Sequence, residues 1–195
     1  MNMLPKALYG DGKWQEVLRA VLETPCEQPV NGGRIGKEKF FIAAILGSPS
    51  LWAEAREALR DKDIGGALKE GLEALKKDFN TPLHYASDAQ SGEAEAVSVL
   101  CPLTSSAMDD EERSLEVAAL TPSGALDAAK LAMRAATSDW RSDPNVSTYK
   151  ANRIELRSDQ PIPAILDGET VELGMRATVE FVPTAFKALV PADTR

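Results

Sequence analysis

The 195-residue sequence contains few of the residues that build metal clusters or nucleophilic catalytic sites, with one histidine and two cysteines. Cys26 and Cys101 stand in unrelated contexts without a C-x-x-C or cysteine/histidine spacing, so neither a zinc site nor a disulfide framework is indicated. We expect both to be buried thiols in a reducing cytosol. His84 has no recognisable serine or cysteine partner, which gives a Ser/His/Asp or Cys/His mechanism no support, and we expect it to face solvent on a strand.

Long hydrophobic runs and an excess of positive charge are also absent. The first nine residues lack the apolar core of a signal peptide, and no run approaches the length of a membrane-spanning helix. The formal net charge is −8, so broad attraction to nucleic acid or to an anionic bilayer is not expected. We therefore expect a cytoplasmic protein that binds no nucleic acid and that is at most peripheral to the membrane, through a local and transient contact.

The composition that remains, 44% hydrophobic and 27% charged, is typical of a soluble globular domain. An amphipathic helix is predicted after Gly10-Asp11-Gly12 and before Thr24-Pro25, because apolar residues recur there with helical spacing. The stripe that we expect this helix to bury consists of Trp14, Val17, Leu18, Val21 and Leu22.

The rest of the first half predicts a strand and a helical pair. Asn31-Gly32-Gly33 is predicted to be a turn, and residues 39–46 form a continuous apolar run typical of a strand buried on both faces. Residues 51–59 and 64–79 then have helical periodicity and predict an α-hairpin.

The second half predicts mainly strands. They are expected at residues 83–86, 96–99, 115–120, 146–149 and 153–157. One long helix interrupts them. It is predicted to begin at Thr121-Pro122, where proline suits the first helical position, and to end at Asp143-Pro144, with Trp140 on its buried side.

The last part of the chain, residues 164–173, 177–183 and 185–191, predicts a β-meander. Asp167-Gly168 is a turn dipeptide between apolar residues, and the turn carries two carboxylates, Asp167 and Glu169. Flanking strands could hold such carboxylates rigidly, as a general base requires. Taken alone, the pattern is more typical of a solvated surface turn, because Asp-Gly-Glu hairpins are common on protein surfaces.

Residues 161–169, P-I-P-A-I-L-D-G-E, and the closing F-V-P and L-V-P segments together resemble the C-terminal signature of the diacylglycerol kinase catalytic family. That family also contains sphingosine kinases and bacterial lipid kinases. The resemblance covers nearly the whole chain and implies an α+β fold, a β-sandwich-like domain with peripheral helices. It assigns residues 11–195 to the C-terminal, lipid-substrate domain, and residues 1–10 to a remnant of an N-terminal nucleotide-binding domain.

The glycine-rich loop that holds ATP phosphates in this family, glycine-glycine-aspartate-glycine-threonine, is missing. Gly32-Gly33 and Gly65-Gly66 do not lie at a strand-to-helix turn whose amides could hold phosphates, and we interpret them as hairpin and helix-start glycines. Met1-Asn2-Met3 resembles the end of a second motif, glycine-threonine-x-asparagine, which implies a nucleotide-binding role for Asn2. Either the chain is part of a kinase of about 300 residues or it is a free-standing substrate domain, and we favour the first.

The resemblance implies an ATP-dependent lipid kinase that transfers the γ-phosphate of magnesium ATP to a hydroxyl of diacylglycerol or a related lipid. Glu169, with Asp167 beside it, would take the hydroxyl proton, and the chain would be inactive without the N-terminal domain. The resemblance also implies a Mg2+ site at Asp109, Asp110 and Glu116. Here the match is imperfect, because residues 111–114 replace a glycine and Glu116 stands where aspartate is usual, so a solvated acidic loop is the alternative.

Other interpretations remain open. A non-catalytic lipid-binding or protein-interaction module would also lack the glycine-rich loop. Trp52 follows a loop that lies near the lipid cleft in the family, so contact with an acyl chain is a second hypothesis beside packing. A domain separated from its partner could also expose an apolar face and form a homodimer through it. The sequence leaves the lipid itself undefined.

Overall fold

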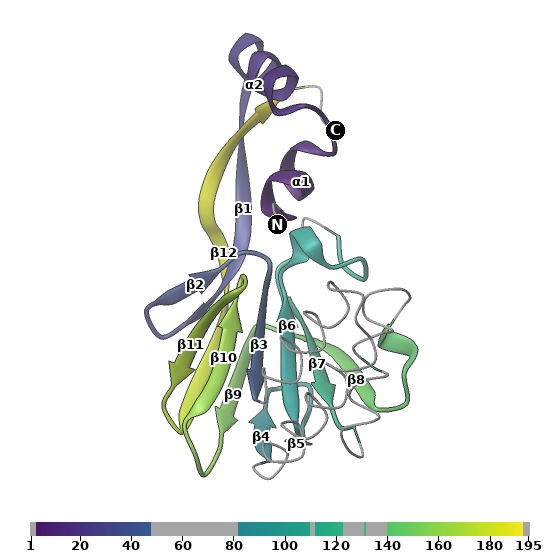
Figure 1. Cartoon of the computed structure of the whole chain (residues 1–195), viewed down its shortest axis with the longest axis vertical. Coiled ribbons are helices and arrows are strands. Elements are labelled where there is room, and N and C mark those ends of the chain that lie inside the picture. Colours follow the sequence, from purple (N-terminus) through teal and green to yellow (C-terminus); the bar gives the residue numbers. More distant parts are fainter. Residues whose placement is uncertain (1–2, 48–81, 110–111, 123–130, 132–139, 193–195) are drawn as a thin grey trace, which may run out of the picture.

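Two antiparallel six-stranded sheets form the body of the protein (Figure 1). The computed structural model describes residues 3–47, 82–109, 112–122, 131 and 140–192. The first sheet has the order β2 (Glu38–Phe40), β1 (Pro25–Ile35), β12 (Arg176–Pro191), β9 (Arg153–Arg157), β4 (Leu83–Ala86) and β5 (Ser91–Ala94). The second has the order β11 (Glu169–Leu173), β10 (Ile162–Leu166), β3 (Ala43–Gly47), β6 (Ala96–Leu100), β7 (Leu115–Leu120) and β8 (Val146–Ala151).

The described helical elements lie outside these sheets. They are α1 (Met3–Tyr9), α2 (Trp14–Glu23) and the short 3-10 turns η1 (Pro102–Thr104) and η2 (Trp140–Ser142). The predicted α+β class, a β-sandwich-like domain with peripheral helices, is confirmed.

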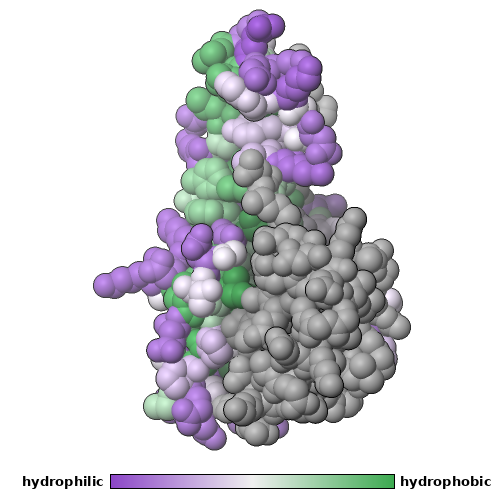
Figure 2. Space-filling model, in the orientation of Figure 1, coloured by the Kyte–Doolittle hydropathy of each residue, from purple (hydrophilic) through white to green (hydrophobic). Residues whose placement is uncertain are grey.

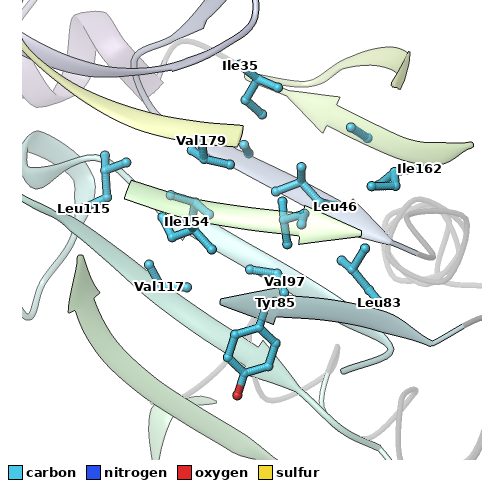
Figure 3. Packing of buried hydrophobic residues seen from close by; sticks show 14 of the residues in the cluster. Ile35, Leu46, Leu83, Tyr85, Val97, Leu115, Val117, Ile154, Ile162 and Val179 are labelled. Atoms are coloured by element: carbon cyan, nitrogen blue, oxygen red, sulfur yellow. The ribbon is translucent and has the colours of Figure 1, made fainter. Parts of the chain in front are cut away.

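Apolar side chains from both sheets fill the space between them (Figure 3). Strand β9 shows the underlying alternation, because Ile154 and Leu156 are buried while Arg153 and Arg157 are exposed. Burial of each such side chain contributes about 1.5–3 kcal/mol relative to its exposure. The sandwich is therefore a well-packed support for the turns at its edge.

Strand β7 is buried at all six positions because its second face is also covered. Ala118 and Leu120 pack there with Leu131, which is helical and fully buried, and Trp140 packs partly against the same cluster. Most of the predicted helix after Thr121-Pro122 lies outside the described residues, as do the predicted α-hairpin of residues 51–79 and Trp52.

Strands β1 and β12 continue beyond the sandwich as a two-stranded ribbon that carries α1 and α2 (Figure 1). Helix α1 is attached to this ribbon by a small core of Leu8, Val30, Ala188 and Val190. The Tyr9 hydroxyl also donates a hydrogen bond to the Leu189 carbonyl at 3.0 Å. The N-terminal segment is thus fixed to the last strand of the chain.

The predicted turn at Asn31-Gly32-Gly33 is wrong, because these residues lie within β1. Gly33 is needed for packing, since a Cβ there would lie 2.0 Å from Cζ of Phe40, whose side chain is fully buried. The chain turns instead at Gly36, where φ is +60°. A left-handed conformation of this kind is easiest for glycine.

Two strand boundaries also differ from the prediction. The apolar run of residues 39–46 divides into β2 and β3, with Phe41 and Ile42 between them. Residues 177–183 and 185–191 form the single strand β12. Its pairing with β1 shifts where Val30 faces Phe186 and Gly32 faces Val182, so Pro183 falls in the irregular segment. A proline is tolerated there because no ladder hydrogen bond requires its missing N–H.

The predicted burial of the α2 apolar stripe is wrong. No residue of α2 is buried, and Trp14 and Leu22 are 69% and 74% exposed. Cys26 on β1 is exposed, whereas Cys101 is buried as predicted. His84 is exposed on β4, as predicted. No helix within the described segments is long and apolar enough to cross a bilayer.

Glu95, between β5 and β6, predicts a pH dependence of stability. Its Oε2 atom is buried without a hydrogen-bond partner, and burial raises its pKa above the ordinary 4.5. The folded state therefore holds this proton more tightly than the unfolded state, so the free energy of unfolding falls as the pH rises from 4.5 through the raised pKa.

We expect Glu95→Gln to raise the melting temperature at neutral pH, and we expect the gain to vanish where both states are protonated. Thermal unfolding of both proteins from about pH 4 to about pH 8 tests this. A gain independent of pH would contradict the assignment to Glu95 ionisation.

Candidate functional site

The Asp167-Gly168 turn joins β10 to β11 at one edge of the second sheet, where Leu166 pairs with Glu169. Asp167 has φ +51° and Gly168 has φ +100°. A two-residue type I′ hairpin turn requires positive φ at both of its central residues, and Asp-Gly is one of the pairs that adopt this conformation most readily. The hairpin predicted from these two residues is confirmed.

The Asp167 carboxylate holds the turn against the segment between β2 and β3. Its Oδ2 accepts a hydrogen bond from the Phe41 amide at 2.7 Å. Its Oδ1 accepts from the Ile42 and Ala43 amides at 2.9 and 3.0 Å. These contacts explain why the apolar run does not continue as one strand, since its amides bind a carboxylate there. Asp167 thus uses both oxygens to fix the position of the turn.

Glu169 is exposed at the start of β11, next to this fixed turn. It lies, with Asp167, at a pocket of about 590 Å³. The described apolar residues that line the pocket are Met3, Leu4, Ile42, Ala43, Ile45, Leu100 and Ile165. Glu169 therefore presents a carboxylate beside an apolar surface of the size range that binds small ligands.

A further hydrogen bond fixes the segment between β2 and β3 where it lines the pocket. Thr104 lines the pocket, and its hydroxyl donates to the Ile42 carbonyl at 2.9 Å.

Cys101 lies just before η1, and burial, with the nearby Asp167 charge, raises the pKa of its thiol. The thiol is therefore protonated at neutral pH and is not a nucleophile. Carboxylate chemistry is what the described pocket offers.

The helix α1 contributes to the pocket through Met3 and Leu4. Asn2, which the sequence associated with nucleotide binding, precedes Met3 and lies outside the described residues. The described lining residues of this pocket include no lysine or arginine. Within the described lining, no side chain therefore provides the positive charge that would hold a triphosphate.

The residues associated with Mg2+ are only partly brought together. Glu116 is buried on β7 and accepts from Arg141 Nε at 2.5 Å and Arg141 Nη2 at 2.8 Å, while the Ser105 hydroxyl donates to its Oε2. Asp109 is exposed, and Asp110 lies outside the described residues. A cation at Glu116 would have to displace Arg141 from this arrangement.

No group of three histidine, cysteine, aspartate or glutamate side chains that could hold a metal ion occurs in the part of the chain that the structure describes. The Mg2+ site at Asp109, Asp110 and Glu116 stays a prediction. What the sequence reading missed was the pairing with Arg141. A signal for it existed, because a glutamate within the apolar strand L-E-V-A-A-L requires a buried partner.

The other residues that sequence reasoning missed are the amides of Phe41, Ile42 and Ala43, which bind Asp167. Backbone amides are present in every residue, so no side-chain pattern marks those that point at a ligand or a carboxylate. The polar role of this apolar segment becomes visible only once the turn and the strand break are placed side by side.

No protein-family model and no curated protein matches the sequence. Solved structures do match its fold. A crystal structure of a diacylglycerol kinase from Bacillus anthracis strain Sterne has a TM-score of 0.55 at 16% identity, covering 87% of this chain and 59% of that chain. A second, assigned as a diacylglycerol kinase from the same strain, has a TM-score of 0.56 at 16% identity, covering 86% and 59%. This chain thus shares the fold and spans about three fifths of the length of these structures.

Proposed function

We propose that this chain is the lipid-substrate domain of an ATP-dependent lipid kinase that phosphorylates a hydroxyl of diacylglycerol or a related lipid. The observation that carries the proposal is the turn itself. Asp167 is fixed by three backbone amides and Glu169 stands beside it at an apolar pocket. This geometry suits a base that meets the hydroxyl of a largely apolar substrate. The fold shared with diacylglycerol kinase structures supports the same reaction class.

Glu169 would act as the general base. Its carboxylate would take the proton of the lipid hydroxyl as that oxygen forms a bond to the γ-phosphorus of ATP. The bond between the γ-phosphorus and the bridging oxygen breaks at the same time, and ADP leaves. Mg2+, bound to ATP as co-substrate, would supply charge neutralisation for the phosphates. The apolar wall of the pocket would hold the acyl part of the lipid and exclude water from the reacting oxygen.

Asp167 would act as a positioning residue. Both of its oxygens are engaged by the amides of Phe41, Ile42 and Ala43, which leaves Glu169 as the carboxylate able to approach the substrate. Misplacing a catalytic group by about 1 Å can cost about 100-fold in rate, so fixing the turn is itself catalytically useful.

ATP would be held mainly by a separate nucleotide-binding domain. The part of the pocket lining that the structure describes has no cationic residue, and positioning of the phosphates is most of phosphoryl-transfer catalysis. We accordingly expect residues 11–195 to be inactive alone, with residues 1–10, including Asn2, belonging to the nucleotide-binding part.

A full-length chimera tests the proposal. In this completed kinase, the present chain replaces the segment of the Bacillus anthracis diacylglycerol kinase that it matches. We expect ATP-dependent labelling of diacylglycerol in mixed micelles by the completed kinase and none by the chain alone. A folded completed kinase that binds ATP and lipid without transferring phosphate would favour the second candidate, a non-catalytic lipid-binding module. The lack of cationic side chains among the described lining residues of the pocket also supports this candidate.

Asp167→Asn should lower the stability and the turnover of the completed kinase together. Asparagine tolerates the positive φ, but its amide N–H would face one of the three amide donors. We expect a loss of about 1–2 kcal/mol in the free energy of unfolding and of about tenfold in kcat. Asp159→Asn, on the exposed loop before β10, is the matched control and should change neither. Full turnover in Asp167→Asn would refute the positioning role.

A further inference from the structure

Three arginine side chains gather at one edge of the first sheet, although the chain as a whole carries a net charge of −8. Arg34 of β1, Arg153 of β9 and Arg176 of β12 line a pocket of about 470 Å³, which we call the arginine pocket. Glu180 is the one carboxylate among its described lining residues. The β1–β2 turn contributes Gly36 to the lining and projects from the body as a hydrophilic segment in Figure 2. The local charge is therefore positive, which attracts anions to this place.

The Glu180 carboxylate holds two of the three guanidinium groups in position. Its Oε2 accepts from Arg34 Nη2 at 2.5 Å, and its Oε1 accepts from Arg153 Nη1 at 2.7 Å. The three residues lie side by side on neighbouring strands, because Glu180 pairs with Arg34 on β1 and with Arg153 on β9. A guanidinium has five N–H donors, so each arginine keeps donors that this carboxylate does not occupy. Both groups are thus oriented in advance, which lowers the entropic cost of binding a further anion.

The Arg176 side chain has no ion-pair partner in the part of the chain that the structure describes. It is exposed at the start of β12, where Arg176 pairs directly with Arg157 of β9. Like charges directly opposite each other destabilise an antiparallel strand pair. Arg157 contacts Glu155 at 3.8 Å, and Arg176 remains uncompensated. An anion in the arginine pocket would offset the repulsion between the two arginines.

The chemistry of the lining favours a phosphate group. Exposed ion pairs contribute little to stability, so packing of the sheet does not account for three arginines at one place. Guanidinium groups bind phosphate oxygens through two parallel N–H bonds, and the tetrahedral phosphate can meet several of them at once. The other side chains of the described lining are Ile35, Leu173, Ala177 and Thr178. Three of these are apolar, which suits a ligand with a carbon-containing part next to its phosphate.

We propose that the arginine pocket binds a phosphate group, carried by a small molecule or by a lipid headgroup, through Arg34, Arg153 and Arg176. It is a second site, because its described lining shares no residue with the pocket of Glu169. Leu173 lies four residues beyond Glu169 on β11, a distance of about 13 Å along an extended strand. The phosphate held here is therefore not the group transferred at Glu169, and the inference does not depend on the proposed function.

Isothermal titration calorimetry of the full chain with inorganic phosphate and with glycerol 3-phosphate tests the site. Chloride keeps the ionic strength constant, so that binding is separated from screening. We expect saturable binding at one site per chain, weakened at least about tenfold by Arg176→Gln and by Arg34→Gln, since each removes charge-assisted bonds to the phosphate. Arg19→Gln removes the same charge from an exposed position on α2 and is the matched control, which should bind like the parent protein.

Vesicles distinguish the two sources of the phosphate group. Sedimentation with phosphatidylcholine vesicles, with and without phosphatidylglycerol, measures binding to a headgroup. Binding of the soluble phosphates that is lost in Arg176→Gln and kept in Arg19→Gln would identify a site for small molecules. The same pattern with phosphatidylglycerol vesicles alone would identify a headgroup site. Absence of both kinds of binding would overturn the proposal, and so would an equal loss in Arg176→Gln and Arg19→Gln, which would show only a general effect of charge.

Discussion

Glu169→Gln should reduce phosphate transfer by the completed kinase by about 10²- to 10⁴-fold, the contribution typical of a positioned general base. Glutamine keeps the size and hydrogen-bonding ability of the side chain but cannot accept the hydroxyl proton. Because Glu169 is exposed and the turn is held by Asp167, neither the melting temperature nor the affinity for lipid should change. Initial rates at saturating ATP and lipid, with thermal unfolding of the same samples, measure both quantities.

Glu172→Gln is the matched control on the same strand. Side chains alternate between the faces of a strand, so Glu172 points away from the face that Glu169 shares with Val171. Its turnover should equal that of the parent protein. If Glu169→Gln and Glu172→Gln behaved alike, whether both active or both inactive with intact folds, the assignment of Glu169 as base would be wrong.

Arg141→Met should destabilise the protein by about 3–5 kcal/mol, because it would leave the buried Glu116 carboxylate without its cationic partner. The Glu116 side chain is only 4% exposed, so water cannot replace the guanidinium. The melting temperature should fall by on the order of 10 °C for a chain of this size. Denaturant unfolding at neutral pH gives the free energy directly.

The double variant Arg141→Met/Glu116→Leu separates the pair from the packing around it. Apolar replacement of a buried ion pair is often neutral, so most of the lost stability should return.

The same experiment addresses the predicted Mg2+ site. If millimolar Mg2+ restored the stability of Arg141→Met but not of the double variant, Glu116 would be able to hold the cation after all. A loss of well under 1 kcal/mol in Arg141→Met would show that the pair is not buried in solution.

The strands were predictable from local pattern because their apolar alternation is strong. The runs at Leu115–Leu120 and Arg153–Arg157 are strands as predicted, and the Asp167-Gly168 hairpin follows from the left-handed conformation its residues allow. The errors arose where distant residues decide the structure. Gly33 lies in β1, where the ring of Phe40 leaves no room for a Cβ, and Pro183 is accommodated by a shift in the pairing of β12 with β1.

The sequence predicted which two carboxylates form the candidate site, but it did not predict what each of them does. Asp167 and Glu169 were identified as a pair from the sequence, but only the contacts with residues 41–43 distinguish a carboxylate that holds the turn from one that is free to react. The α2 stripe illustrates a different limit. Its periodicity correctly predicts a helix, yet an apolar stripe does not specify whether its partner belongs to the same domain.

The pairing of β1 with β12 also determines when the protein can fold during synthesis. Pro25 pairs with Pro191, so β1 must wait for a partner that is synthesised much later in the chain. Contacts so distant in sequence form slowly because the chain must first lose the entropy of a very large loop. Until then α1 cannot pack in its final position, because Ala188 and Val190 form part of the small core that attaches α1 to the ribbon. A nonsense mutation that removed only the end of β12 would therefore release the N-terminal helices at the opposite end of the sequence.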